Sequence, residues 1–236
     1  MKQILLTLLS ICCLCTCILS SGVMLCINVP AITDNLSRAT ATVDIAKFNR
    51  DQLVNMANKT RAFVASETER NDLYGTIEQI NKEANTQYAN NEGADFAAVD
   101  EQYSLDSKNI SHLQDVRDLF ANVKIAFTIC GVGAIIFLVL IFIFCGRSAF
   151  GRALMWSGLL ILAILIILGV WAIIDFNSMF NWLHSLFFKG GTWLFSENSL
   201  MICMYPTAFW VGMASICVGT SLIASLILII VGKIVK

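Results

Sequence analysis

Two histidines are the residues in this sequence with the clearest capacity for chemistry. His112 lies in the stretch "NISHLQDVRDLF", residues 109–120, and His184 lies in the aromatic stretch "FNWLHSLFF", residues 180–188. An imidazole exchanges a proton near neutral pH, so it can act as a general base or a general acid. Asp115 follows His112 by three residues, a spacing that puts both side chains on one face of a helix. This pattern predicts a carboxylate that fixes the tautomer of the His112 ring and favours its protonated form.

Other catalytic and metal-binding motifs are absent from the sequence. "GRSAF" contains a serine but lacks the second glycine of a nucleophile elbow, and there is no phosphate-binding glycine loop or metalloprotease helix motif. The nine cysteines all lie in apolar stretches, and we interpret "CCLCTC" as small side chains packed in a membrane helix rather than a soft-metal site. A catalytic zinc would need a carboxylate from Asp115 or Asp175 beside the histidines, which is the weaker alternative. We therefore expect no metal and no cofactor.

The composition is that of a membrane protein. Hydrophobic residues make up 57% of the chain and charged residues 14%, whereas soluble domains carry about 25% charged residues. Four charge-free segments, residues 4–29, 125–145, 153–174 and 208–231, are long enough for a bilayer span, which takes about 20 residues. The first is longer than the core of a cleavable signal and has no clear cleavage site, so we expect it to remain as a span. The net charge of −1 argues against nucleic-acid binding.

The basic residues of the short connections predict the orientation. They all fall on one side of the predicted spans: Lys2, Arg147, Arg152, Lys233 and Lys236. Such residues face the cytoplasm, so both termini are expected there. The outer side then receives a large segment with fifteen acidic and nine basic residues, and a shorter aromatic one. Both histidines lie in these outer segments, which predicts a shared site on the extracytoplasmic face.

The predicted fold is an all-α, polytopic membrane protein with four transmembrane helices and a helical extracytoplasmic segment after the first. The predicted ranges are 1–29 (first span), 30–122 (extracytoplasmic helical segment), 123–145 (second span), 146–152 (cytoplasmic loop), 153–174 (third span), 175–206 (aromatic interfacial segment) and 207–236 (fourth span and cytoplasmic end).

Within residues 30–122, apolar positions at helical spacing predict one amphipathic helix clearly. Its stripe consists of Leu53, Met56, Ala57, Phe63 and Val64. Asn49 is the expected N-cap, with Gln52 three residues later, and Asp106 is the expected cap of a further helix. Between residues 71 and 100 the pattern weakens, and "NNEGAD" predicts a loop.

The order of these segments resembles that of the bacterial lipoprotein intramolecular transacylases and their relatives. The resemblance covers most of the chain and is specific at His112-Leu113-x-Asp115-Val116-Arg117 and at His184-x-x-Phe187-Phe188. Departures are Asn109, where the family usually has Glu, and the extra length of residues 71–100. The resemblance implies that the sn-2 acyl chain of a diacylglyceryl-cysteine moves to the α-amino group of the same cysteine, at the outer leaflet of the bacterial cell membrane. Donor and acceptor then belong to one molecule, so no acyl-enzyme is expected.

The predicted catalytic pair is His112 and His184, one ring neutral as the base and the other protonated. Five further residues are expected to orient groups or bind substrate: Asp115, Arg117, Lys189, Trp193 and Tyr205. Arg117 either holds a phosphate or carboxyl group or pairs with Asp118. We expect the two imidazoles within about 10 Å of each other, a separation that one substrate can span, and a bend or steep tilt between His112 and Lys124.

The expected partners are the diacylated lipoprotein N-terminus and membrane lipid; no oligomeric state is predicted. Two other functions fit the same residues. A lipid hydrolase would use water in place of the amine and release free fatty acid. A non-enzymatic sensor or accessory protein would bind a partner through its outer helical segment and would not need either histidine.

Overall fold

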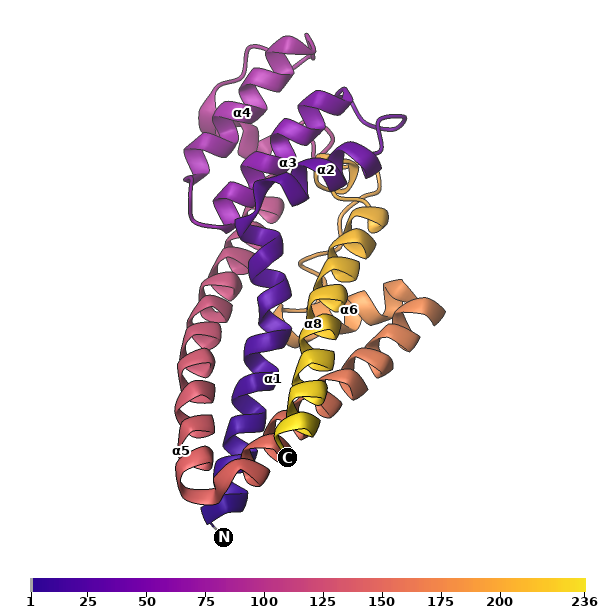
Figure 1. Ribbon diagram of the computed structural model, residues 1–236. Coiled ribbons are helices and arrows are strands. Elements are labelled where there is room, and N and C mark those ends of the chain that lie inside the picture. The colour runs from indigo at the N-terminus through magenta and orange to yellow at the C-terminus, as the bar shows by residue number, and fades with distance from the viewer. Residues whose placement is uncertain (1) are drawn as a thin grey trace. The chain divides into compact units, whose positions relative to one another are not determined.

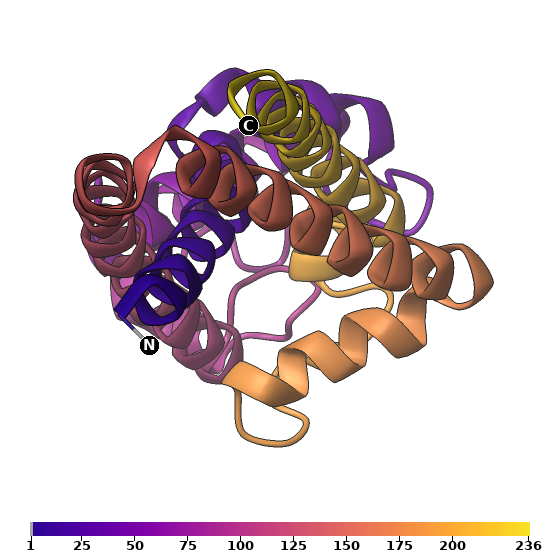
Figure 2. The same ribbon diagram turned by 60° about the horizontal axis from the view of Figure 1, so that its bottom comes forward.

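The computed structural model describes residues 2–236, and every regular element in this range is a helix (Figures 1 and 2). Met1, the first residue of the predicted first span, lies outside the described residues. The helices are α1 (Lys2–Asn28), α2 (Pro30–Thr40), α3 (Arg50–Val64), α4 (Arg70–Glu83), the 3-10 helix η1 (Gly93–Ala98), α5 (Ser107–Ile174), α6 (Phe176–Phe187), α7 (Leu200–Met204) and α8 (Thr207–Val235).

The chain divides into two compact units. The first, called here the apolar unit, comprises the chain up to Leu25 together with Asn122–Met179 and Ala214–Lys236. The second, called here the site unit because it contains both histidines, comprises Cys26–Ala121 and Phe180–Met213.

Three helices are long and apolar enough to cross a membrane: Gln3–Asn28, Ser107–Ile174 and Thr207–Val235. The 68-residue helix α5 contains non-helical backbone at Gly146, where φ is 80°, in a region that glycine enters without steric cost. Both views show α5 folding back on itself (Figures 1 and 2). The structure therefore has three apolar helices, one of them reversed along its length, where the sequence predicts four separate spans.

Small residues allow the helices of the apolar unit to approach closely. A Cβ atom on Gly151 would lie 2.7 Å from the carbonyl oxygen of Gly232, and one on Gly158 would lie 2.5 Å from that of Ser225. Contacts of this kind are typical of helix pairs in membranes, where packing rather than hydrophobic burial holds helices together. Large apolar side chains such as Ile129, Phe144 and Ile173 are exposed, as expected for a surface that faces lipid.

The core of the site unit forms around α3. The predicted stripe is confirmed, because all five of its side chains are buried. The predicted cap is confirmed as a capping box: the backbone N–H of Gln52 donates to Asn49 Oδ1 and that of Asn49 donates to Gln52 Oε1, both at 3.0 Å. Asp106 caps α5 as predicted, accepting from the backbone N–H of Asn109 at 2.8 Å.

Residues 71–100 contain more helix than the sequence pattern indicates. Leu73, Ile77 and Ile80 form a narrow buried stripe on α4, and most of the remaining positions are polar, which weakens the pattern. The expected loop "NNEGAD" is correct only for its first residues, because η1 begins at Gly93.

The predicted bend between His112 and Lys124 is absent. The non-helical backbone inside α5 is at Gly146, far beyond Lys124. A tilt would be measured against the membrane and stays a prediction. The bend was expected in order to bring His112 towards the aromatic segment; within the site unit, that segment instead folds around the His112 ring.

Candidate functional site

The two imidazoles lie together in the site unit. His112 is in the second turn of α5 and only 8% exposed, and His184 is half-buried near the end of α6. Their ring centroids are 6.2 Å apart, with 30° between the ring planes. The expectation that the rings lie within about 10 Å of each other is confirmed.

Aromatic rings line the space around this imidazole pair. The His112 ring lies 5.0 Å from Phe188 and 5.7 Å from Phe195, centroid to centroid. The His184 ring lies 4.0 Å from Phe180 and 5.6 Å from Trp193. Burial among these rings lowers the local dielectric constant around the imidazoles, which disfavours a charged imidazolium.

A backbone carbonyl fixes the tautomer of His184. Its Nδ1 lies 2.9 Å from the carbonyl oxygen of Phe180, one helical turn earlier. A carbonyl oxygen only accepts, so Nδ1 carries the proton and Nε2 of the neutral ring has a free lone pair. Burial lowers the pKa of His184, and the bond to Phe180 opposes that shift in part. Nε2 of His184 is therefore a neutral base.

The hydrogen bonding of His112 differs from that of His184. Among residues 2–236, its Nδ1 is buried without a hydrogen-bond partner, and so is Oδ1 of Asn109, three residues earlier on the same helix. Nδ2 of Asn109 donates to Asp106 at 2.7 Å. A buried N–H without an acceptor is rare, whereas an unpaired lone pair costs less. We therefore assign the proton of the neutral His112 ring to Nε2.

Both rings favour the neutral form. His112 lies in the first turns of α5, before the charge-free run that begins at residue 125. Burial is the main cause that lowers its pKa from 6.5 to about 4, and His184 and the Lys108 ammonium contribute the rest of that shift. The prediction of one protonated and one neutral imidazole is therefore wrong for this structure, because aromatic burial outweighs any nearby carboxylate.

Lys108 and Glu101 are site residues that the sequence analysis missed. Lys108 Nζ donates to the carbonyl oxygen of Leu194 at 2.5 Å and stands 4.9 Å above the ring of Phe195. The hydroxyl of Ser196 donates to the Glu101 carboxylate. Residues 194–196 are thereby fixed beside His112. The partners lie 86 and 95 positions apart in the chain, so no local pattern signals them.

Trp193 lies at the site, whereas Asp115 faces away from it. Trp193 packs beside His184, and its Nε1 donates to Asn181 Oδ1 at 3.0 Å. Asp115 is exposed, and no hydrogen bond joins it to His112 within residues 2–236. The orienting role predicted for Asp115 is therefore wrong for this structure. At about 100° per residue, a three-residue step still turns the two side chains about 60° apart.

Arg117 is not directed at the imidazoles. Its guanidinium pairs with Glu69 at 3.2 Å and lies 4.9 Å from the ring of Phe63. The alternative pairing with Asp118 is wrong, because the Asp118 carboxylate accepts a hydrogen bond from Gln114 instead.

Neither Lys189 nor Tyr205 forms a hydrogen bond to an imidazole within residues 2–236. Lys189 is exposed, and its ammonium group forms no ion pair with any residue from 2 to 236. Tyr205 is buried and donates from its hydroxyl to the carbonyl oxygen of Ala57 at 2.5 Å. Tyr205 thus anchors the segment before α8 to α3.

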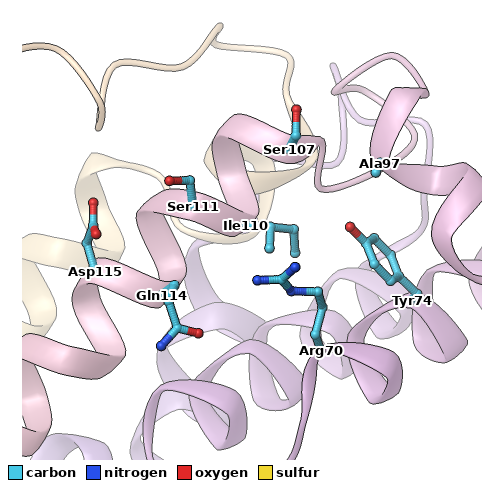
Figure 3. A pocket seen from close by; sticks show the side chains of 8 residues that line it. All are labelled: Arg70, Tyr74, Ala97, Ser107, Ile110, Ser111, Gln114 and Asp115. Carbon is cyan, nitrogen blue, oxygen red and sulfur yellow. The ribbon is translucent and has the colours of Figure 1, made fainter.

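A cavity of about 350 Å³ lies beside the first turns of α5 (Figure 3). Its polar lining residues are Arg70, Tyr74, Ser107, Ser111, Gln114 and Asp115. His112 does not line this cavity. Among the described residues, no group of three or more His, Cys, Asp and Glu side chains is arranged to hold a metal ion.

Comparisons with known proteins point to one family. The family model described as lipoprotein intramolecular transacylase Lit matches residues 7–210. None of the curated proteins matches the chain in sequence. The solved structure of the membrane-integral Lit from Bacillus cereus is similar with a TM-score of 0.73 and 14% identity, covering 99% of this chain and 95% of that one. Two structures of the same protein with a substituted histidine give TM-scores of 0.63 and 0.68 at 14% identity, covering 99% of this chain and 92% and 93% of those chains. At this identity the solved structures show a shared fold.

Proposed function

This chain belongs to the lipoprotein intramolecular transacylase family, and from that membership we propose that it moves the sn-2 acyl chain of a diacylglyceryl-cysteine to the α-amino group of the same cysteine at the outer leaflet. The observation that carries the proposal is the stacked pair of neutral imidazoles, 6.2 Å apart within aromatic walls. The two rings offer one free lone pair and one N–H, which are the groups that this transfer requires.

The reaction needs no external reactant. The amine nitrogen attacks the ester carbonyl carbon, the N–C bond forms, and the bond from that carbon to the sn-2 oxygen breaks. One proton leaves the nitrogen and one proton arrives on the departing oxygen, so the protons balance. Because both groups belong to one substrate molecule, holding them in attack geometry replaces an enzyme nucleophile.

His184 is assigned the role of base. Its Nδ1 donates to the Phe180 carbonyl oxygen, so Nε2 is free to take the proton that the amine loses as it attacks. The same nitrogen can then return that proton to the departing sn-2 oxygen. The carbonyl of Phe180 stabilises the transient imidazolium, in the way that a carboxylate does in other histidine sites.

His112 is assigned the role of hydrogen-bond donor. With the proton on Nε2, it can donate to the carbonyl oxygen as negative charge develops there. Its low pKa keeps the ring neutral, so the oxyanion receives a hydrogen bond from an uncharged N–H. In a site lined by Phe188 and Phe195 such a bond is stronger than in water.

The aromatic walls favour transfer over hydrolysis. Phe180, Phe188, Trp193 and Phe195 cover the imidazole pair and leave little room for a competing water. They also offer an apolar surface to the acyl chain and disfavour the ammonium form of the attacking amine.

The membrane arrangement belongs to the same proposal. We infer four crossings, because α5 reverses near Gly146 and each of its arms contains one of the predicted apolar runs. Arg147 and Arg152 at this reversal favour the cytoplasmic side. The termini are then cytoplasmic, and the site unit faces outward.

The deciding experiment is mass spectrometry of the N-terminus of a lipoprotein from cells with and without this gene. We expect an N-acylated cysteine that carries a monoacyl glyceryl group only when the gene is present, with the total number of acyl chains unchanged. A product that has lost an acyl chain as free fatty acid would identify a hydrolase. An unchanged N-terminus would contradict any acyl transfer.

A further inference from the structure

The cavity beside α5 has the polar groups of a binding site that the imidazole chemistry does not use. Arg70, at the start of α4, directs its guanidinium into the cavity in Figure 3. Within residues 2–236 this guanidinium forms no ion pair and no hydrogen bond. Its positive charge is therefore available to a ligand.

The neighbours of Arg70 supply further donors. Tyr74 is 5% exposed, and burial raises the pKa of its phenol, so the hydroxyl stays protonated and can donate. Ser107 and Ser111 of α5 also line the cavity, with their hydroxyls directed away from the Arg70 guanidinium (Figure 3). A guanidinium beside a phenol donor is suited to a carboxylate.

Two lining residues favour a peptide over a lipid phosphate. The Asp115 carboxylate lies at one end of the cavity, where a phosphate group offers it no hydrogen-bond donor (Figure 3). It can accept a hydrogen bond from a backbone N–H, and the amide of Gln114 can bond to either side of a peptide group. A polypeptide with one acidic side chain satisfies all of these groups.

The cavity and the imidazole pair share the same turns of α5. Ser107, Ser111 and Gln114 line the cavity, whereas His112 faces the aromatic walls. At about 100° per residue, the two faces are roughly a third of a turn apart around a helix about 10 Å across. An extended peptide covers about 3.3–3.6 Å per residue, so about three or four residues bridge this distance.

We propose that the cavity binds an acidic side chain located about three or four residues after the acylated cysteine of the lipoprotein. The inference rests on the proposed function, because it requires the cysteine to lie at His112 and His184. The cavity would recognise the polypeptide of the substrate, whereas the imidazole pair acts on its acyl ester.

The test uses the purified full chain in lipid nanodiscs with synthetic diacylglyceryl-cysteine peptides. The peptides carry Asp, Asn or Lys at the third or fourth residue after cysteine and are otherwise identical. For the unmodified chain, we expect KM for the Asp peptide to be about three- to tenfold below that of the Asn peptide, as for a partly exposed charge-assisted contact. Arg70→Gln should abolish this difference and leave kcat unchanged.

Two further variants sharpen the test. Lys82→Gln removes one positive charge from the opposite end of the same helix, where Lys82 is paired with Glu78, and should preserve the preference for Asp. Arg70→Glu should reverse the preference, so that the Lys peptide acquires the lowest KM. A simple loss of folding cannot produce such a reversal.

The outcomes distinguish failure of the proposed peptide subsite from failure of the proposed acyl transfer. If the unmodified chain converts all peptides with equal KM, or if Arg70→Gln affects every peptide alike, the subsite is overturned while the transfer stands. A KM that follows the anionic lipid content of the nanodiscs instead of the peptide sequence would identify a lipid headgroup as the ligand and overturn the peptide site. Absence of an N-acylated product from every peptide would overturn the proposed function, and the subsite with it.

Discussion

Two ring nitrogens, Nε2 of His184 and Nε2 of His112, carry the proposed chemistry. Nε2 of His184 has a free lone pair because Nδ1 of that ring donates to the Phe180 carbonyl oxygen. Nε2 of His112 carries an N–H, assigned because Nδ1 of that ring has no partner among the described residues. Neither ring can replace the other, because their surroundings fix opposite tautomers. The pair should therefore behave as a single unit in mutagenesis.

His112→Ala and His184→Ala should each lower kcat by about 100-fold or more, the usual contribution of a general acid or base. The double variant should have a kcat no lower than that of either single variant, because the effects of substituting residues that act as a unit are not additive. Activity is measured as conversion of a diacylated lipopeptide, and the control is Ser185→Ala, next to His184 in α6, whose hydroxyl donates to the Trp182 carbonyl oxygen. Substantial turnover by either single variant would rule out the two-histidine mechanism.

Burial of His112 should also appear in the pH dependence of stability. The folded ring has a pKa of about 4, against 6.5 for an ordinary histidine. Between these values the unfolded chain binds a proton that the folded chain does not, so stability present above about pH 6.5 is lost as the pH falls towards about 4. The shift corresponds to at most about 3 kcal/mol.

We expect the Tm of the purified protein to fall between pH 6.5 and pH 4, and His112→Phe to reduce that fall. Phenylalanine retains the aromatic packing but removes the titrating group. Equal slopes of Tm against pH for the two proteins would show that His112 is not held neutral by the fold.

Residues 189–199 complete the site because they are attached to the first turn of α5 and to the chain just before it. Lys108 bonds to Leu194, Glu101 accepts from Ser196, and the backbone N–H of Leu200 donates to the carbonyl oxygen of Glu101 at 2.7 Å. This segment carries Trp193 and Phe195, two of the aromatic walls. Its attachment therefore determines whether the imidazoles are shielded from water.

Lys108→Met should loosen this segment while α5 remains intact. Methionine keeps an apolar stem over Phe195 but loses the charged donor, a bond worth about 1.5–3 kcal/mol. Hydrogen exchange of residues 192–196 should then accelerate by about tenfold or more, with exchange in α3 unchanged. Lys82→Met on α4 is the matched control, and equal exchange in both variants would assign no holding role to Lys108.

Local patterns in the sequence predict elements better than they predict the site. The buried stripe of α3 and the capping box at Asn49 depend on neighbours within a few residues, and both are confirmed. Arg117 and Tyr205 were expected at the imidazoles because they belong to the motifs around them or to the following segment. Their partners Glu69 and Ala57 lie 48 and 148 positions away, and no periodicity reveals such pairs.

The distribution of charged residues along the chain should determine which side of the membrane each connecting segment occupies. The connections next to the charge-free runs divide into a basic set, with Arg147 and Arg152, and the acidic segment of residues 30–122. Basic residues near the ends of spans are retained in the cytoplasm. In the proposed topology, the reversal of α5 at Gly146 returns the chain outward, and we expect His112 and His184 to lie in the same compartment at the ends of different spans.

Impermeant thiol labelling of intact cells tests this sidedness. Asn91→Cys, in the loop before η1, should be labelled on intact cells, whereas Ser148→Cys, beside Arg147, should be labelled only after lysis. Asn91 is partly exposed and Ser148 is exposed. The nine native cysteines all lie in apolar stretches. Their background labelling is measured in the unmodified chain. Labelling of Ser148→Cys on intact cells with protection of Asn91→Cys would place the imidazole pair on the cytoplasmic side, where a transfer at the outer leaflet could not occur.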